Sequence, residues 1–200
     1  GLYDDINVHS GGRADLSDCT FSGDYAKVTY YAGSSGTLDN LSGEYWDLSI
    51  NSDQVSTVNG IDVDTLYVNA SATVTNSTIS IVRLYSGSPT LTGNAIASGT
   101  PFVMHDPDVD MSGISGNIFT PSDLRIEISG SLNDSRTLDF VDGIGQYVYG
   151  GVLTVSNGST LTIAPGVEIH TTNSNSSVFD LEVYGELHAA GVLFTGHYDD

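Results

Sequence analysis

The densest run of carboxylates in the chain spans residues 106–110, where Asp106, Asp108 and Asp110 occupy alternate positions. Side chains at positions i, i+2 and i+4 of an extended strand share one face, so these three carboxylates could converge on one cation. Calcium is the expected cation, because it prefers oxygen ligands. The run lacks the central glycine and the distal glutamate of an EF-hand loop. We therefore interpret it first as a solvated turn and keep a calcium site as the alternative.

A second set of candidate ligands lies near the two ends of the chain, where the tripeptide Tyr-Asp-Asp occurs twice. It supplies Asp4 and Asp5 at one end and Asp199 and Asp200 at the other. If such chains followed one another head to tail, these four carboxylates would come close together. Four acidic side chains are a reasonable calcium site at such a junction. Calcium is thus the one cofactor that the sequence suggests.

Tyrosine is the aromatic residue in excess, with 11 copies against one tryptophan. Tyr30-Tyr31, Tyr45-Trp46, Tyr147 and Tyr149 could line a groove and stack against sugar rings. In a strand, however, alternation turns one member of each adjacent pair inward. We therefore interpret these rings first as core or surface packing, and sugar binding stays open.

The charge of the chain limits its partners. Twenty-five acidic residues against five Lys and Arg give a formal net charge of −20 and an isoelectric point near 4.1. Such a surface repels nucleic-acid phosphates and anionic lipid, so we expect neither nucleic-acid binding nor membrane insertion. It suits bound divalent cations or a salty medium that screens the repulsion. Both conditions point to an extracellular or cell-surface location.

The elements that must position these residues are short strands. Alternating runs such as 26–30, 45–50 and 78–82 recur, and segments rich in Gly, Asn, Ser and Asp separate them. Few junctions have the Asn-Gly or Asp-Gly pairs of tight hairpins, which argues against an antiparallel sandwich. Small apolar triplets return at roughly the 20–25-residue spacing typical of solenoids. The pattern predicts an all-β fold of parallel, stacked coils.

Two stretches sharpen this prediction by resemblance. Together they resemble the repeat modules of right-handed parallel β-helices in large secreted or surface bacterial proteins, of the adhesin or surface-fibre type. The resemblance covers residues 138–200 well and 80–118 moderately. It implies a β-solenoid fold and a secreted context but no single activity, because the family serves adhesins, fibres and polysaccharide enzymes alike. The segments that carry it are Tyr85-Ser86-Gly87-Ser88-Pro89-Thr90-Leu91-Thr92-Gly93-Asn94-Ala95-Ile96, Tyr147–Val155, Ser159–Ile169 and Leu181–Gly196.

The family's enzymes make polysaccharide cleavage the catalytic alternative. A uronate lyase needs a strong base opposite cations, but the basic residues of this chain are spread singly along the sequence. A polygalacturonase-like hydrolase would show a Gly-His-Gly motif, which is absent, and carboxylate pairs mean little where one residue in eight is acidic. We therefore expect no enzyme and no catalytic residues. The basic residues are Arg13, Lys27, Arg83, Arg125 and Arg136.

The organisation along the chain suggests three parts. Residues 1–118 are expected to form β-helix coils, 119–146 an irregular cap or linker, and 147–200 the opening coils of the next module. Because residues 1–23 resemble a continuation of the pattern at residue 200, the chain is interpreted as one period of a longer tandem array. The predicted function is mechanical: a rigid extracellular rod or filament, adhesive or structural, built by head-to-tail stacking with itself as partner. Surface-glycan binding or cleavage is the alternative.

Overall fold

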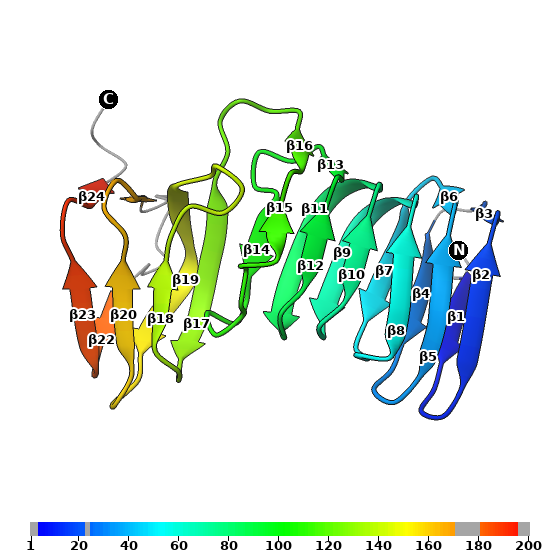
Figure 1. Cartoon of the computed structure of the whole chain (residues 1–200), viewed down its shortest axis with the longest axis horizontal. Coiled ribbons are helices and arrows are strands. Elements are labelled where there is room, and N and C mark those ends of the chain that lie inside the picture. Colours follow the sequence, from blue (N-terminus) through cyan, green and yellow to red (C-terminus); the bar gives the residue numbers. More distant parts are fainter. Residues whose placement is uncertain (1–3, 23–24, 171–180, 196–200) are drawn as a thin grey trace.

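The computed structural model describes residues 4–22, 25–170 and 181–195, and these residues form a stack of strands and turns without a helix. Figure 1 shows the coils following one another along the long axis, from β1 at one end to β24 at the other. Every pairing between named strands is parallel, and the one antiparallel contact in the described residues is the bridge between Val141 and Ile144. The predicted all-β solenoid is confirmed.

The largest sheet runs the length of the stack, and its main path joins ten strands, each hydrogen-bonded to the next. These strands are β1 (Asp4–Val8), β4 (Ala26–Tyr30), β7 (Trp46–Ile50), β9 (Asp62–Asn69), β11 (Thr78–Ser86), β14 (Phe102–Met104), β17 (Ile126–Leu132), β19 (Gln146–Val155), β21 (Glu168–His170) and β24 (Leu193–Thr195). Beside this path, β13 (Ala95–Ile96) pairs with β11 and with β16 (Ile118–Phe119), and β22 (Leu181–Val183) pairs with β19.

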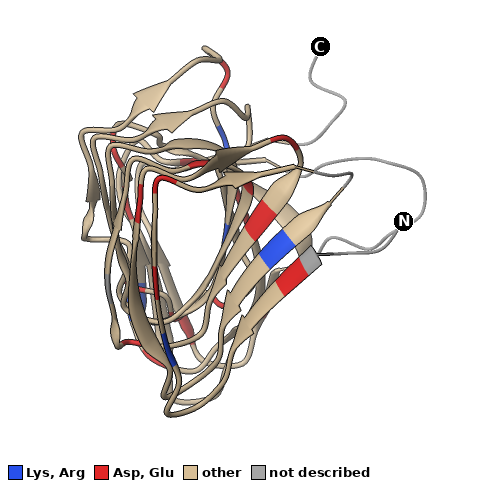
Figure 2. Ribbon diagram, turned by 90° about the vertical axis from the view of Figure 1, so that its right-hand side faces the viewer, with Lys and Arg blue, Asp and Glu red and all other residues tan. Residues whose placement is uncertain are grey.

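Three smaller sheets form the other walls. The second sheet consists of β2 (Arg13–Ser17), β5 (Ser35–Asp39), β8 (Val55–Asn59), β10 (Thr73–Thr75), β12 (Thr90–Thr92) and β15 (Ile114–Ser115). The third consists of β18 (Arg136–Leu138), β20 (Thr160–Ile163) and β23 (Glu186–Ala189), and the fourth of β3 (Thr20–Phe21) and β6 (Ser42–Gly43). Figure 2 views the stack from the end that carries β1, with acidic segments outnumbering basic ones on the walls.

The core is a continuous column of side chains that point inward at equivalent positions of successive coils. Along the largest sheet, the paired residues Val28, Leu48, Leu66 and Val82 are each 0% exposed. Burying each aliphatic side chain contributes about 1.5–3 kcal/mol to folding. Because every coil covers the inward side chains of its neighbours, no coil is stable alone.

Coil length is less regular than the sequence pattern predicts. The coil that leads from Leu66 to its partner Val82 is much shorter than the coil that leads from Phe102 to its partner Ile126. Turns absorb the difference outside the sheets. Where neighbouring coils approach closely, a side chain does not fit. Gly36 on β5 has a φ of +156°, and a Cβ there would lie 1.8 Å from the carbonyl oxygen of Ala14 on the neighbouring coil.

The ladder of the second sheet is interrupted between β15 and β18. These strands belong to consecutive coils, because β14 and β17, which precede them, pair with each other. Yet β15 pairs with β12 and β18 pairs with β20, and the two do not join one ladder. Within residues 119–146, β17 and β18 continue the stack, and the turn at 139–145 follows β18.

Candidate functional site

The acidic run at 106–110 forms a turn between β14 and β15 and is not a strand. Each carboxylate accepts hydrogen bonds from a different part of the backbone. Asp106 Oδ1 accepts from the N–H of Asp108 at 2.9 Å, and Asp110 Oδ1 accepts from the N–H of Ser112 at 3.0 Å. The extended strand on which the predicted convergence depended is therefore absent, and calcium binding by Asp106, Asp108 and Asp110 stays a prediction.

Asp108 bridges two consecutive coils. Its carboxylate accepts from the backbone N–H groups of Asn133 and Asp134 at 3.0 Å each, and its carbonyl oxygen accepts from Arg136 Nη2 at 2.8 Å. Anionic acceptors make stronger hydrogen bonds than neutral ones. Asp108 thus ties the turn after β14 to the turn after β17, which is a structural role.

The structure brings no three candidate metal-ligating side chains together within the ranges it describes. Asp5 is exposed on β1, and Asp4 belongs to the same strand. Asp199 and Asp200 lie outside the described residues. A calcium site at a junction of Asp4, Asp5, Asp199 and Asp200 therefore stays a prediction.

In each of the adjacent pairs Tyr30-Tyr31 and Tyr45-Trp46, one ring is buried and the other is exposed, as strand alternation predicts. Tyr30 and Trp46 are 0% exposed, whereas their neighbours Tyr31 and Tyr45 are 43% and 61% exposed. The Tyr30 hydroxyl donates to the Ala14 carbonyl oxygen at 2.8 Å, and burial raises the pKa of Tyr30 to about 12. Tyr30 is therefore a core residue with a satisfied hydroxyl group.

The same holds for the pair on β19. Tyr147 and Tyr149 are 1% and 4% exposed. The Tyr147 hydroxyl donates to the carbonyl oxygen of Asp139 at 2.6 Å. Burial raises the pKa of Tyr147 above its usual range, and it raises the pKa of Tyr149 to about 12. Neither ring is available to stack on a sugar.

The largest sheet carries a row of rings on its outer side that the sequence analysis missed. Tyr67, Tyr85 and His105 stack in order, with ring centroids 6.5 Å and 4.6 Å apart. Lys27 Nζ lies 4.8 Å from the Tyr67 ring centroid, a cation–π contact. The three rings come from three successive coils, so neighbouring members of the row are about one coil length apart in the sequence. That spacing is the signal by which the row could have been found.

The electrostatics of this row centre on His105. Burial lowers the pKa of His105, and the neighbouring Arg83, whose Nη1 lies 3.4 Å from His105 Nε2, lowers it further. On the same face, burial raises the pKa of Asp47, although Asp47 accepts a hydrogen bond from the Thr65 N–H at 3.2 Å. The row is thus a partly desolvated, mixed-charge surface.

Each end of the described stack is formed by a strand of the largest sheet that has one neighbour among the described strands. Among the described strands, β1 pairs only with β4, and β24 pairs only with β21. Ile6 on β1 is 36% exposed, although Val28, its partner on β4, is fully buried. Phe194 on β24 is 51% exposed, although its partner Ile169 is 1% exposed.

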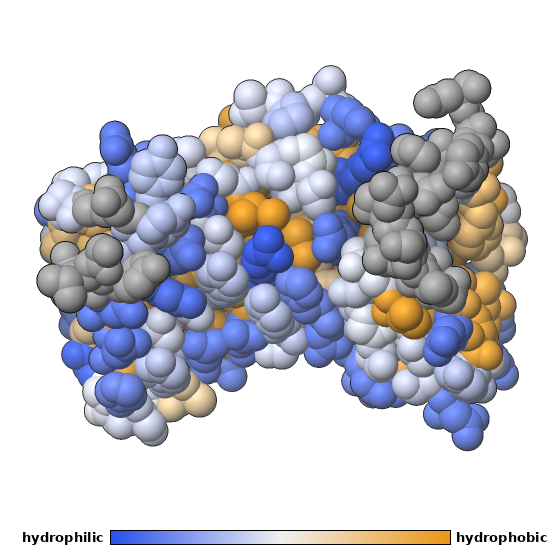
Figure 3. All heavy atoms as spheres, turned by 180° about the vertical axis from the view of Figure 1, so that it is seen from behind, coloured by the Kyte–Doolittle hydropathy of each residue, from blue (hydrophilic) through white to orange (hydrophobic). Residues whose placement is uncertain are grey.

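The end formed by β22 and β24 is the more apolar of the two. Leu193 is 52% exposed and Val183 is 42% exposed. Figure 3, which views the molecule from behind, shows apolar atoms at the end of the stack where the last coils lie. Each of these ends exposes side chains that a further coil would bury.

No protein-family model, curated protein or solved structure matches the chain. The described residues include no helix long and apolar enough to cross a membrane. The fold and the geometry of its surfaces therefore carry the functional argument.

Proposed function

We propose that the chain is a structural or adhesive module that forms a rigid rod by stacking its coils head to tail. The observation that carries the proposal is the exposure of core positions at the two ends. Ile6 and Phe194 occupy register positions at which their partners on the next coil inward are buried. An added coil would remove these apolar side chains from water, which is the main driving force for association.

The direction of the strands suits end-to-end growth. All named pairs are parallel, so a second copy placed on β24 would present its β1 with the same strand direction. Each open edge would then gain main-chain hydrogen bonds of the kind used in β-strand addition. A closed antiparallel sheet offers no such continuation along one axis.

The charge of the side walls favours growth along the axis over growth sideways. A formal net charge of −20 makes the walls of neighbouring rods repel each other. Charged side walls are a general device against unwanted edge-to-edge aggregation. Salt would weaken this repulsion, because it screens exposed charges.

The proposal includes an extracellular or cell-surface location and a calcium requirement at the junction of Asp4, Asp5, Asp199 and Asp200. The high negative charge supports both. Titration calorimetry with CaCl₂ tests the junction: calcium should bind and increase self-association. Association that is unchanged by calcium and by EDTA would remove calcium from the proposal.

The stacking itself is tested by sedimentation velocity of the chain and two variants. Phe194→Lys places a charge on the end surface and should shift the distribution from oligomers to monomers. Tyr45→Lys changes a residue that is 61% exposed away from the β24 end and should leave the distribution unchanged. Equal sedimentation of all three proteins as monomers at every concentration would contradict head-to-tail stacking.

Polysaccharide binding or cleavage is the second candidate function. The outer row of Lys27, Tyr67, Tyr85 and His105 supports it, because one cation and the polar edges of three rings suit the hydroxyl groups of a sugar. The rings stack on one another, so a glycan would be held by hydrogen bonds and charge more than by ring faces. A glycan array together with a reducing-end assay would distinguish binding from cleavage.

A further inference from the structure

Each end of the stack carries a charged pair on an edge strand of a side wall. Among the described strands, β2 pairs only with β5, and β23 pairs only with β20. On β2, Arg13 Nε lies 2.8 Å from Asp15 Oδ2, and on β23, His188 Nε2 lies 3.4 Å from Glu186 Oε2. These four side chains are 47–70% exposed, so both pairs are open to a partner.

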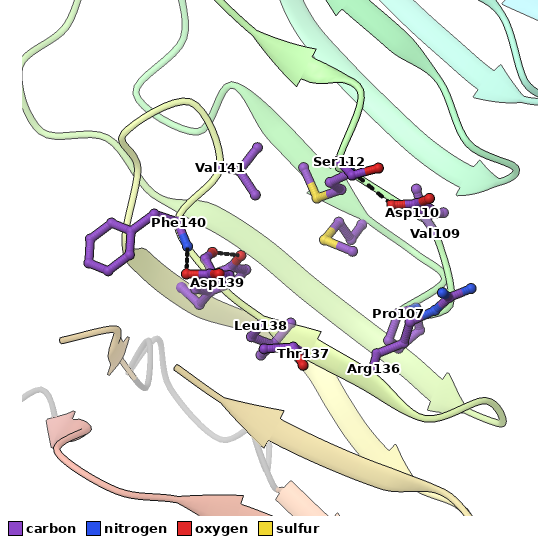
Figure 4. Close-up of a pocket in the computed structure, with 13 residues that line it drawn as sticks. Pro107, Val109, Asp110, Ser112, Arg136, Thr137, Leu138, Asp139, Phe140 and Val141 are labelled. Atoms are coloured by element: carbon purple, nitrogen blue, oxygen red, sulfur yellow. Dashed lines mark hydrogen bonds between the residues drawn. The ribbon is translucent and has the colours of Figure 1, made fainter. Parts of the chain in front are cut away.

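The strands β2 and β23 occupy equivalent places relative to the largest sheet. Residues 9–12 lead from β1 to β2, and residues 156–159, a turn of equal length, lead from β19 to β20, the strand that pairs with β23. Figure 1 shows β2 and β23 on the same side of the stack, at opposite ends. The two walls are separate ladders, because β15 and β18 do not pair, and a cavity beside Met104 and Met111 lies at this break (Figure 4). The break lies inside the stack, so both end strands stay open to a neighbouring copy.

Strand alternation restricts how β2 of one copy can lie on β23 of another. On β2, Ala14 and Leu16 point inward, and the partner of Leu16 on β5 is fully buried. On β23, Leu187 points inward, and its partner on β20 is 1% exposed. A shift by one residue would turn inward side chains outward, so the register can change only in steps of two. The registers with the greatest overlap of the two strands place Leu187 opposite Gly12, opposite Ala14 (the middle register) or opposite Leu16.

The order of the charges distinguishes these registers. In the middle register, Glu186 lies opposite Arg13, and His188 lies opposite Asp15. A shift of two residues in one direction would set Glu186 against Asp15, and a shift in the other direction would set His188 against Arg13. Opposite charges directly across a strand pair stabilise it, and like charges destabilise it. The middle register is therefore the one in which both charged positions are complementary.

The carboxylate of Asp15 is held in place from its own side of the end. Asp15 Oδ1 accepts hydrogen bonds from the Thr37 N–H at 3.1 Å and from Thr37 Oγ1 at 3.0 Å, both on β5. The hydrogen bond from Arg13 lowers the pKa of Asp15, and the hydrogen bond from the Thr37 side chain lowers it further. Asp15 is therefore a positioned anion on the end strand, and a cation on a neighbouring copy would meet it without rearrangement.

From these observations we infer that β2 of one copy pairs with β23 of the next in the middle register, so that Arg13 lies against Glu186 and Asp15 against His188. The occupant of each end strand is thus a second copy of this chain. The inference rests on the proposed head-to-tail stacking, and it adds the wall and the register at which two copies meet. Docking would also cover the inward side chains of both strands, which are half-buried or exposed at the free ends.

Charge reversal tests this pairing, with self-association of the whole chain measured by sedimentation velocity over a range of concentrations. Arg13→Glu and Glu186→Arg each set like charges against each other, and each should weaken self-association about tenfold. Net charge alone predicts opposite effects of the two variants, because one makes the chain more negative and the other less negative. The variant that carries both changes restores opposite charges and should regain most of the lost association.

An equimolar mixture of the two single variants provides a second measurement. Each variant alone has ends of like charge, but in the mixture each end of one variant meets an oppositely charged end of the other. The mixture should therefore associate more strongly than either variant does by itself.

Two control variants change the same charges away from the end strands. Arg125→Glu matches Arg13→Glu, because Arg125 Nη2 also lies 2.8 Å from an aspartate two residues away but precedes β17 inside the stack. Glu44→Arg matches Glu186→Arg, because Glu44 is exposed and lies between β6 and β7. Both controls should sediment like the unmodified chain, and circular dichroism checks the fold of every variant.

The outcomes separate the register from rod formation itself. Weaker association of both folded single variants, with recovery in the double variant and in the mixture, would support the pairing. If the unmodified chain associates and the single variants associate equally well, the register is overturned while head-to-tail stacking stands. The register is also overturned if neither the double variant nor the mixture recovers. A chain that stays monomeric at every concentration would overturn the proposed function and this inference together.

Discussion

Asp142 bridges the break between β15 and β18, and its replacement tests the fold at that point. Its Oδ1 accepts from the Gly116 N–H at 2.7 Å, and its Oδ2 accepts from the Asn117 N–H at 2.7 Å and from Asn117 Nδ2 at 2.9 Å. Asn117 in turn accepts from Asn94 Nδ2 at 2.9 Å. Asp142 therefore ends a column of amide contacts that runs across the break between β15 and β18.

We expect Asp142→Ala to lower the free energy of unfolding by about 3 kcal/mol. Half-buried Asn117 would lose two acceptors and exposed Gly116 one, which together cost about 2 kcal/mol after partial rehydration. Asp142 also has a φ of +49°, where alanine costs about 1 kcal/mol more than aspartate. Asp142→Asn keeps the turn and one acceptor, and should cost about 1 kcal/mol.

Urea unfolding followed by circular dichroism measures these differences, and amide hydrogen exchange at Gly116 and Asn117 locates them. Asp134→Ala is the control, because Asp134 is an exposed aspartate in a turn of the same coil. The reasoning is refuted if Asp142→Ala and Asp134→Ala unfold at the same urea concentration. It is also refuted if exchange at residues 116 and 117 does not accelerate in the Asp142→Ala protein.

Three further predictions follow from individual contacts. Gly36→Ala should lower the free energy of unfolding by more than about 3 kcal/mol, because the alanine Cβ would overlap a carbonyl oxygen of the adjacent coil. Thermal or urea unfolding measures this change, and a variant of normal stability would contradict the close approach of the two coils. His105 should titrate below pH 6.5 by NMR, and Arg83→Gln should raise that midpoint. Because the pKa of His105 is lowered by folding, its contribution to stability is present above pH 6.5 and is lost as the pH falls toward the folded pKa. Asp47→Asn should stabilise the fold at pH 7 by about 0.5–1 kcal/mol, because folding raises the pKa of Asp47 and its ionised form therefore disfavours the folded state at high pH. Asp47 is half-exposed, so solvent screening limits the gain. A loss of stability in urea unfolding would show that the hydrogen bond from the Thr65 N–H outweighs the cost of burial.

The strands and their parallel stacking were predictable because they follow from local patterns. Alternation places Tyr30 and Trp46 inward and their neighbours outward, and small turn residues set the corners. The amide contacts between coils form separate pairs and do not follow from local patterns. Asn94 and Asn117 bond each other, whereas Asn69 bonds Asn51 and Asn76 bonds Asn59.

The candidate sites were harder to predict because they depend on how coils of unequal length align. A turn, rather than a strand, positions the three carboxylates at 106–110, and Asp106 and Asp110 accept hydrogen bonds from backbone N–H groups of that turn. The cavity beside Met104 and Met111 arises where β15 and β18 fail to pair, and neither strand is unusual in sequence. The sequence spacing of Tyr67, Tyr85 and His105 permits stacking, but coils differ in length, so the spacing alone does not align the rings.

Electron microscopy of the purified chain tests the central claim, head-to-tail stacking, most directly. The ten strands on the main path of the largest sheet, spaced by about 4.8 Å, give one unit a length of roughly 43 Å. Stacking predicts straight rods several such units long, and the Phe194→Lys protein should give single units. Isolated particles of one unit from the unmodified chain at every concentration, with or without calcium, would contradict the account.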